Sequence, residues 1–257
     1  MGDRTVLKVD DVSLMFGGLK ALDRISLEME KGEVLCIIGP NGAGKTTLFN
    51  CITGFLKPSA GRIIYDNSIE LTGKKPHTIA SYGLYRSFQN LALFTHLTVL
   101  ENILIGGLKR KDVSYNIIDA LFYTSKFKNG EYSLKKESVQ ILEFLGLADK
   151  KDTYTSELPY GKRKLLELAK GLITKPKLLL LDEPAAGLNT TEKVELVNAI
   201  KKVVAQKIDV VIIEHDMRFV SDIANWIVVL DYGKKIAEGL PEDVKKDRAV
   251  IEAYIGS

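Results

Sequence analysis

The most informative feature of this sequence, for both fold and ligand, is a glycine-rich segment between a predicted strand and a predicted helix. Residues 39–46 read Gly-Pro-Asn-Gly-Ala-Gly-Lys-Thr, which fits the pattern G-x-x-x-x-G-K-S/T. The apolar run at residues 34–38 predicts a buried strand, and residues 45–53 predict a helix that ends at Gly54. Glycines allow successive backbone N–H groups to point at a phosphate, and the helix N-terminus adds partial positive charge. The segment therefore predicts a phosphate-binding loop, or P-loop.

The expected ligand of this loop is ATP with Mg²⁺. Lys45 is expected to bridge the β- and γ-phosphates, and the Thr46 hydroxyl is expected to ligate the metal. A GTPase is disfavoured because the chain has no Asn-Lys-x-Asp sequence to read guanine. Nucleotide contacts are assigned to Gly39, Pro40, Asn41, Gly42, Ala43, Gly44, Lys45, Thr46 and Thr47.

A second motif supplies two carboxylates. Four leucines at residues 178–181 are followed by Asp182 and Glu183, so a buried strand delivers both acids to its carboxyl end. Ligands of α/β proteins bind at that end of the sheet. Asp182 is expected to hold Mg²⁺, and Glu183 is expected to orient and polarise the water that attacks the γ-phosphate.

Two further polar residues are candidates for the same site. His215 follows a predicted strand at residues 210–214, which makes it a candidate donor to the γ-phosphate. Gln89 lies where the predicted core passes into a helical segment, and it is a candidate ligand of Mg²⁺ or of the attacking water.

The predicted fold class is α/β, a P-loop NTPase core with a mostly parallel sheet. Strands alternate with helices on both sides of the chain's midpoint, which is typical of parallel sheets covered by helices. An alternating pattern at residues 25–29 predicts an N-terminal antiparallel β part. We expect one domain over residues 1–257, with its core at 1–89 and 166–257 and an inserted helical subdomain at about 90–165. A short helix is expected near residues 115–123.

Net charge, apolar runs and the positions of histidine and cysteine argue against a nucleic-acid-binding, membrane-spanning or secreted protein and against a histidine metal site. The 257 residues carry a formal charge of only +3 in scattered positions, so no nucleic-acid partner is expected. No apolar run is long enough to span a bilayer, and the N-terminus has no secretory signal pattern. Three widely spaced histidines show no metal-ligand pattern, and Cys36 and Cys51 are expected to be buried thiols.

The order of these motifs resembles that of ABC (ATP-binding cassette) transporter ATPases over nearly the whole chain. The resemblance implies that Phe16 stacks on adenine, that Gln89 is the Q-loop glutamine and that His215 is the switch histidine. It also implies that Asn189 belongs to a D-loop at residues 186–189. Family members pair so that two subunits sandwich two ATP molecules, which implies a second ATPase subunit, identical or related, as a partner.

The signature loop of this family, L-S-G-G-Q, is altered here. Residues 158–162 read Leu-Pro-Tyr-Gly-Lys, so the serine hydroxyl and the first glycine are absent. Gly161 remains, at the start of an amphipathic helix predicted over residues 162–173. We expect Pro159, Tyr160 and Gly161 to face the ATP held by the partner subunit.

Three stretches resemble the subfamily of branched-chain amino acid importers: residues 16–22, the Tyr-Gly signature and residues 182–189. The expected function is therefore the ATP-hydrolysing motor of an importer, bound to multi-spanning permease subunits. Its expected place is the cytoplasmic face of the plasma (inner) membrane. The alternative is a soluble ABC ATPase for DNA repair, translation or cofactor assembly, which would favour long heptads or strongly basic patches. A small-molecule kinase would leave the signature and His215 unexplained.

Overall fold

The structure is a computed structural model that describes residues 5–87, 91–108, 110 and 125–255. Gln89 and the helix expected near residues 115–123 lie outside these ranges. The chain divides into two units: residues 1–86, 177–187 and 200–257 form the first, and residues 87–176 and 188–199 form the second.

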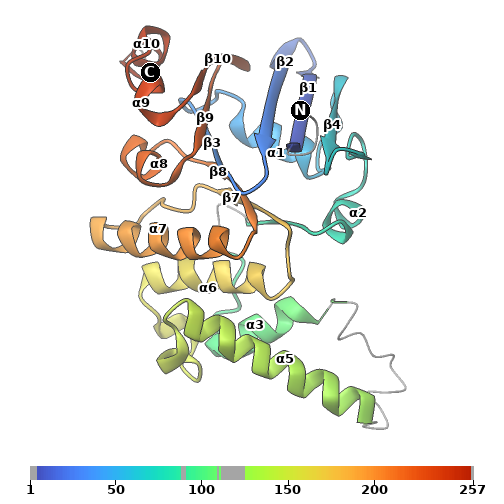
Figure 1. The fold of residues 1–257 in the computed structure, drawn as a ribbon, viewed down its shortest axis with the longest axis vertical. Coiled ribbons are helices and arrows are strands. Elements are labelled where there is room, and N and C mark those ends of the chain that lie inside the picture. The colour runs from blue at the N-terminus through green and yellow to red at the C-terminus, as the bar shows by residue number, and fades with distance from the viewer. Residues whose placement is uncertain (1–4, 88–90, 109, 111–124, 256–257) are drawn as a thin grey trace. The chain divides into compact units, whose positions relative to one another are not determined.

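The centre of the first unit is a six-stranded sheet with the order β10-β9-β3-β8-β7-β6 (Figure 1). All neighbours in it are parallel except the pair β9 and β10. Its strands are β3 (Val34–Ile38), β6 (Leu84–Arg86), β7 (Leu178–Asp182), β8 (Asp209–Ile213), β9 (Trp226–Asp231) and β10 (Lys234–Gly239). Every residue of β3, β7 and β8 is buried, as expected for strands covered on both faces. The predicted mostly parallel sheet is confirmed.

A separate antiparallel sheet, with the order β2-β1-β4-β5, belongs to the same unit. Its strands are β1 (Thr5–Phe16), β2 (Leu19–Glu30), β4 (Ala60–Tyr65) and β5 (Ile69–Glu70). Apolar residues alternate along β1 and β2, so one face of each strand joins the core. The predicted antiparallel part is confirmed.

The helices of the first unit are α1 (Lys45–Ile52), α2 (Pro76–Ser81), α8 (Met217–Ile223), α9 (Pro241–Val244) and α10 (Arg248–Ile255). Helix α1 begins at Lys45, within the P-loop segment, and packs Leu48, Phe49 and Ile52 into the core. Cys36 and Cys51 are buried and free, and burial raises the pKa of the Cys51 thiol to about 11.

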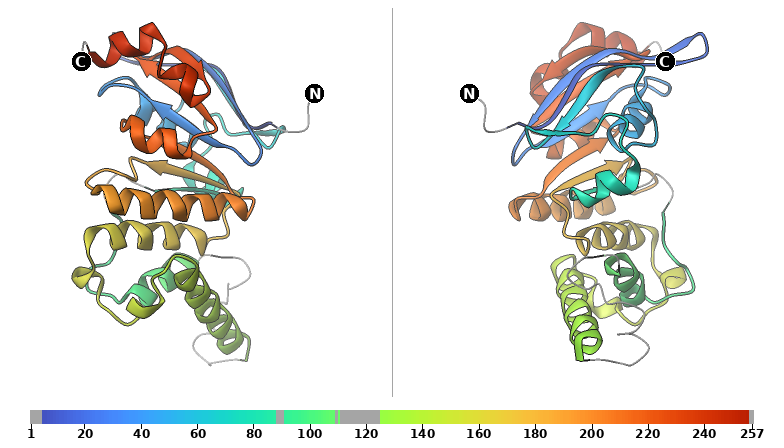
Figure 2. Two further views of the ribbon diagram at one scale, coloured as in Figure 1. Left: turned by 60° about the vertical axis from the view of Figure 1, so that its left-hand side comes forward. Right: turned by 90° about the vertical axis from the view of Figure 1, so that its right-hand side faces the viewer.

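The second unit is helical. It contains α3 (Val99–Gly107), α5 (Ser125–Phe144), α6 (Tyr160–Leu172), two short 3₁₀ turns at Ala148–Lys150 and Thr155–Glu157, and the first part of α7 (Thr190–Ala205). Helix α6 and the start of α7 run side by side (Figure 2). The apolar residues from Leu134 onward indicate a helix over residues 134–145, and helix α5 begins nine residues earlier, at Ser125, because its first turns are polar and carry no apolar period.

Candidate nucleotide-binding and hydrolysis site

Three adjacent parallel strands bring the predicted motifs to one edge of the sheet. Strand β8 lies between β3 and β7, with Ile37 and Asp182 both paired to Ile213. The carboxyl ends of parallel strands meet at the same edge, which is where α/β proteins bind ligands. The P-loop, the two carboxylates and His215 therefore start from neighbouring positions, although they are far apart in the sequence.

The P-loop is held in a tight conformation by its glycines and by Lys45. A Cβ atom added to Gly39, whose φ is +148°, would lie 2.0 Å from the carbonyl oxygen of Leu230. The Lys45 ammonium donates to the carbonyl oxygens of Gly39 and Pro40 at 2.6 and 2.8 Å. Burial lowers the pKa of Lys45, and the nearby carboxylates oppose that shift. The loop thus carries a buried cation directly under its phosphate-binding surface.

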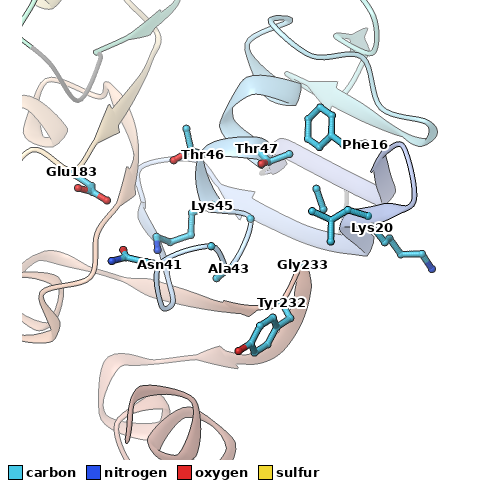
Figure 3. A pocket seen from close by; sticks show the side chains of 14 residues that line it. Phe16, Lys20, Asn41, Ala43, Lys45, Thr46, Thr47, Glu183, Tyr232 and Gly233 are labelled. Carbon is cyan, nitrogen blue, oxygen red and sulfur yellow. The ribbon is translucent and has the colours of Figure 1, made fainter. Parts of the chain in front are cut away.

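An open cavity of about 410 Å³ lies over this loop (Figure 3). Its lining combines the P-loop with side chains from the antiparallel sheet, from the end of β7 and from the turn after β9. The lining residues are Phe16, Leu19, Lys20, Ala21, Asn41, Gly42, Ala43, Gly44, Lys45, Thr46, Thr47, Glu183, Tyr232 and Gly233. Seven of the nine predicted P-loop contacts therefore line one cavity together with Phe16 and Glu183.

The carboxylate of Asp182 is almost fully buried and is paired with a cation. Its Oδ2 accepts a hydrogen bond from the Arg86 guanidinium at 2.8 Å, and the two side chains are only 5% and 7% exposed. Arg86 also donates to Asn50 Oδ1 at 2.6 Å and to Thr53 Oγ1 at 3.0 Å. Arg86 therefore ties the acid at the end of β7 to the helix that begins at the P-loop.

Glu183 and His215 approach one another at the strand ends. His215 Nδ1 lies 3.9 Å from Glu183 Oε1, and the imidazole is half exposed. Glu183 has a left-handed backbone with φ +47°, a conformation that costs energy outside glycine and that clusters at functional sites. The backbone N–H of Glu183 donates to the Ile213 carbonyl at 2.9 Å, which fixes this unusual geometry.

The buried carboxylate of Glu214 holds the backbone next to Glu183 and His215. Its carboxylate accepts hydrogen bonds from the backbone N–H groups of Ala185 at 2.7 Å and His215 at 3.1 Å. Burial raises the pKa of Glu214, and these hydrogen bonds partly offset the shift. The side chain is 1% exposed, so it acts as an internal brace and has no access to a ligand.

The altered signature loop and Asn189 of the D-loop lie in the second unit, where the carboxylate of Glu192 contacts both. Glu192 Oε1 accepts from the Gly161 N–H at 3.2 Å, and Glu192 Oε2 accepts from the Asn189 N–H at 3.0 Å. Asn189 Oδ1 in turn accepts from the Glu192 N–H at 3.0 Å. A Cβ atom on Gly161 would lie within 2.7 Å of the Glu192 side chain, so the glycine leaves room for this contact.

The sequence did not indicate several residues of these sites: Arg86, Glu192, Glu214 and the lining residues Leu19, Lys20, Ala21, Tyr232 and Gly233. The pattern Asn-x-x-Glu at residues 189–192 is a capping-box signal that could have identified Glu192. Arg86 and Glu214 have no comparable signal, since their roles depend on which strands become neighbours. Of the predicted residues, Pro159 caps α6, Tyr160 is 42% exposed, and Gln89 lies outside the part of the chain that the structure describes.

The aromatic wall of the cavity leads to a first prediction. Phe16 is half exposed and lines the cavity, so Phe16→Ala should weaken ATP binding and spare inorganic triphosphate, which has no base. Stacking of a base on an aromatic side chain is worth about 1–3 kcal/mol in other nucleotide sites. Calorimetric titration of both ligands checks this, with Tyr154→Ala, a similarly exposed aromatic, as the matched control. Equal losses for ATP and triphosphate would mean that Phe16 only supports the fold.

Comparison with known proteins agrees with this geometry. The family model described as ABC transporter matches residues 22–186, and the model described as branched-chain amino acid ATP-binding cassette transporter matches residues 234–257. The high-affinity branched-chain amino acid transport ATP-binding protein BraF of Pseudomonas aeruginosa is 39% identical, with 98% of each chain covered. LivG of Escherichia coli K12, which carries the same description, is 37% identical, also with 98% of each chain covered.

Solved structures show the same fold. A nucleotide-free ATP-binding cassette from an ABC transporter superposes with a TM-score of 0.85 at 36% identity, covering 98% of this chain and 100% of that one. The ADP conformation of an ATP-binding cassette superposes with a TM-score of 0.86 at 36% identity, covering 98% and 99%. The chain therefore belongs to the ABC transporter family and is one of its ATP-binding, ATP-hydrolysing subunits.

Proposed function

We propose that this chain is the motor subunit of an importer for branched-chain amino acids or similar small solutes. The observation that carries this proposal is the match of residues 234–257 to the branched-chain amino acid transporter model, because the P-loop core is common to the whole ABC family. Relatives with this description match over 98% of their length. The match covers β10 and the two C-terminal helices, which lie outside the cavity.

The experiment that tests this function is purification of the tagged chain from membranes of its own cells. A motor subunit should bring down a multi-spanning membrane protein in a stable complex. A soluble ABC ATPase for DNA repair, translation or cofactor assembly would bring down no such protein, and that result would overturn the proposal. In the part of the chain that the structure describes, none of the helices could span a membrane.

The catalytic steps follow from the chain's own side chains. Lys45 holds the β- and γ-phosphates and offsets the charge that develops on them. Glu183 accepts a proton from a water whose oxygen attacks the γ-phosphorus, while the bond from that phosphorus to the oxygen shared with the β-phosphate breaks. His215, close to Glu183, donates a hydrogen bond to a γ-phosphate oxygen. Most of the rate enhancement then comes from positioning.

The donor groups at the strand ends fit Mg²⁺. The ion prefers oxygen ligands and is commonly held by one or two protein groups together with the nucleotide phosphates. The Thr46 hydroxyl lines the cavity at the start of α1, and the Asp182 carboxylate is held by Arg86 at the end of β7. Thr46 and Asp182 would hold the ion, with Gln89 as the remaining expected ligand. When bound, the metal neutralises charge on the transferred phosphoryl group.

The active form that we propose is a pair of ATPase subunits on the cytoplasmic face of the plasma (inner) membrane. In it, Pro159, Tyr160, Gly161 and Asn189 of one subunit face the ATP held by the other. Pairing on ATP would move the helical segment, and with it permease subunits docked near residues 94–101. Phe94 is half exposed and offers an apolar contact there.

Gly161→Asp tests the action in trans. The variant places a second carboxylate against Glu192 and a negative charge where the partner's γ-phosphate is expected. Each subunit should still bind ATP, because its own P-loop is unchanged. Hydrolysis in the assembled complex should fall at least about tenfold, the scale of a loss of about 1.4 kcal/mol. Phosphate release and ATP titration measure the two effects separately.

Two controls make this result specific. Glu192→Gln keeps the shape around Gly161 and removes only the charge of the carboxylate. Its hydrolysis rate shows how much of the decrease in Gly161→Asp comes from disturbing the Glu192 contact. Where the chain pairs with itself, mixing Gly161→Asp with Lys45→Ala subunits should restore some activity, since one composite site is then intact. If Gly161→Asp weakens ATP binding by the single subunit as much as Lys45→Ala does, the role in trans is wrong.

A further inference from the structure

Tyr232 stands in an unfavourable backbone conformation beside the P-loop. It forms, with Gly233, the two-residue turn between β9 and β10, and the two residues have φ angles of +42° and +75°. Turns of this kind, with positive φ at both central residues, strongly favour Asn-Gly. A bulky aromatic residue with positive φ is an outlier that needs a reason.

The packing of the protein does not supply that reason. The Tyr232 side chain is 85% exposed, so the ring contributes little to the core. The ring does line the cavity that also contains Phe16 and the P-loop. Figure 3 shows Phe16 above Lys45 and Tyr232 below it, both on the side of the loop away from Glu183.

The turn is fixed to the P-loop by its backbone. The Gly233 N–H donates to the carbonyl oxygen of Ala43 at 3.0 Å, and the Asp23 N–H donates to the Gly233 carbonyl at 2.7 Å. The backbone of Tyr232 is therefore held close to the P-loop, although its side chain is exposed. A fixed backbone position lowers the entropy that is lost when a ligand packs against the ring.

We propose that Tyr232 is a nucleoside-binding residue, a second aromatic contact beside Phe16 for the base and ribose of the bound nucleotide. The proposal rests on the proposed nucleotide site at the P-loop. With the triphosphate on the loop, the nucleoside extends into the rest of this cavity. The exposed rings of Phe16 and Tyr232 line that part. Aromatic rings bind bases through their faces. On this proposal, the strained backbone at Tyr232 is retained because it places an aromatic ring next to the nucleoside.

The first test measures binding of ATP and of inorganic triphosphate to Tyr232→Ala. The affinity for ATP should fall about tenfold, within the range of one lost base–aromatic contact. The affinity for triphosphate should stay at the wild-type value, and Tyr232→Phe should keep the wild-type affinity for ATP. Tyr132→Ala removes another strongly exposed tyrosine, in α5 of the second unit, and serves as the matched control. Unchanged ATP affinity in Tyr232→Ala, or equal losses for both ligands, would overturn the proposal.

The second test uses the strain itself. Tyr232→Asn places in the turn the residue that its geometry favours, so it should raise Tm by about 1–4 °C. The same variant should lose affinity for ATP as Tyr232→Ala does. A rise in Tm with wild-type ATP affinity would show that the ring serves no nucleoside. Lys45→Ala distinguishes an error in the nucleotide site from an error in the role of Tyr232. If Lys45→Ala and the Tyr232 variants all keep wild-type ATP affinity, the nucleotide site is wrong. If Lys45→Ala loses affinity and the Tyr232 variants do not, only the role of Tyr232 is wrong.

Discussion

Replacing Lys45 with alanine is expected to lower the affinity for MgATP by about a hundredfold or more, since each hydrogen bond from a charged donor is worth about 1.5–3 kcal/mol. In the free protein the ammonium is buried and donates to the carbonyl oxygens of Gly39 and Pro40. ATP would replace these partners with phosphate oxygens. Titration with a fluorescent ATP analogue measures the loss.

The loss in Lys45→Ala must be separated from a collapse of the loop. Lys45→Met keeps most of the side-chain volume and removes the charge and its hydrogen bonds, so it should lose the same affinity. Thermal unfolding of both variants shows whether the fold is retained. Wild-type affinity for ATP in either variant would remove the P-loop assignment, since Lys45 is the one cation that this loop buries.

Replacing Glu183 with glutamine is expected to keep ATP binding and to slow hydrolysis by at least about 10²-fold, the scale of a lost general base. Glutamine has nearly the same shape and meets the same backbone strain at φ +47°, so the change acts on proton transfer and leaves the turn intact. Steady-state phosphate release at saturating MgATP measures the rate, and ATP titration provides the control for binding.

The same variant should trap the paired state, because ATP stays intact between the subunits. Light scattering of the complex or of the isolated chain with and without ATP should show an ATP-dependent increase in mass. A variant that hydrolyses ATP at close to the wild-type rate would exclude Glu183 as the base, and the nearby His215 would then be the next group to replace.

The core of the site was predictable because its signals are local. The P-loop pattern, the apolar run before it and the acidic pair after four leucines each lie within ten residues. Their meeting at one sheet edge follows from the general rule for parallel strands. Strand β7, Leu178–Asp182, contains the four leucines of the predicted strand, and all five of its residues are buried.

The rest of the site depends on contacts that no local pattern encodes. Arg86 and Asp182 are 96 positions apart in the chain, and they meet only because β6 pairs with β7. Tyr232 reaches the P-loop because β9 lies beside β3. The antiparallel edge strand β10 was missed, although the Gly after Tyr232 is a hairpin signal between two strands.

The signature loop has a second structural role that its sequence did not indicate. Gly161 is proposed to face the partner's ATP, where a residue without a side chain lets a phosphate approach closely. The structure shows that Glu192, 31 residues later, already occupies the space beside Gly161. The glycine therefore has a packing role within its own subunit, and an experiment on mixed subunits separates this role from the proposed role in trans.

Uptake of labelled leucine, isoleucine and valine by cells that lack the chain's gene tests most directly whether ATP hydrolysis in this cavity powers solute import. Wild-type protein should restore uptake. Lys45→Ala and Glu183→Gln, present at equal levels and bound to the same membrane partner, should not. Restored uptake with either variant, or uptake that does not depend on this chain at all, would contradict the account.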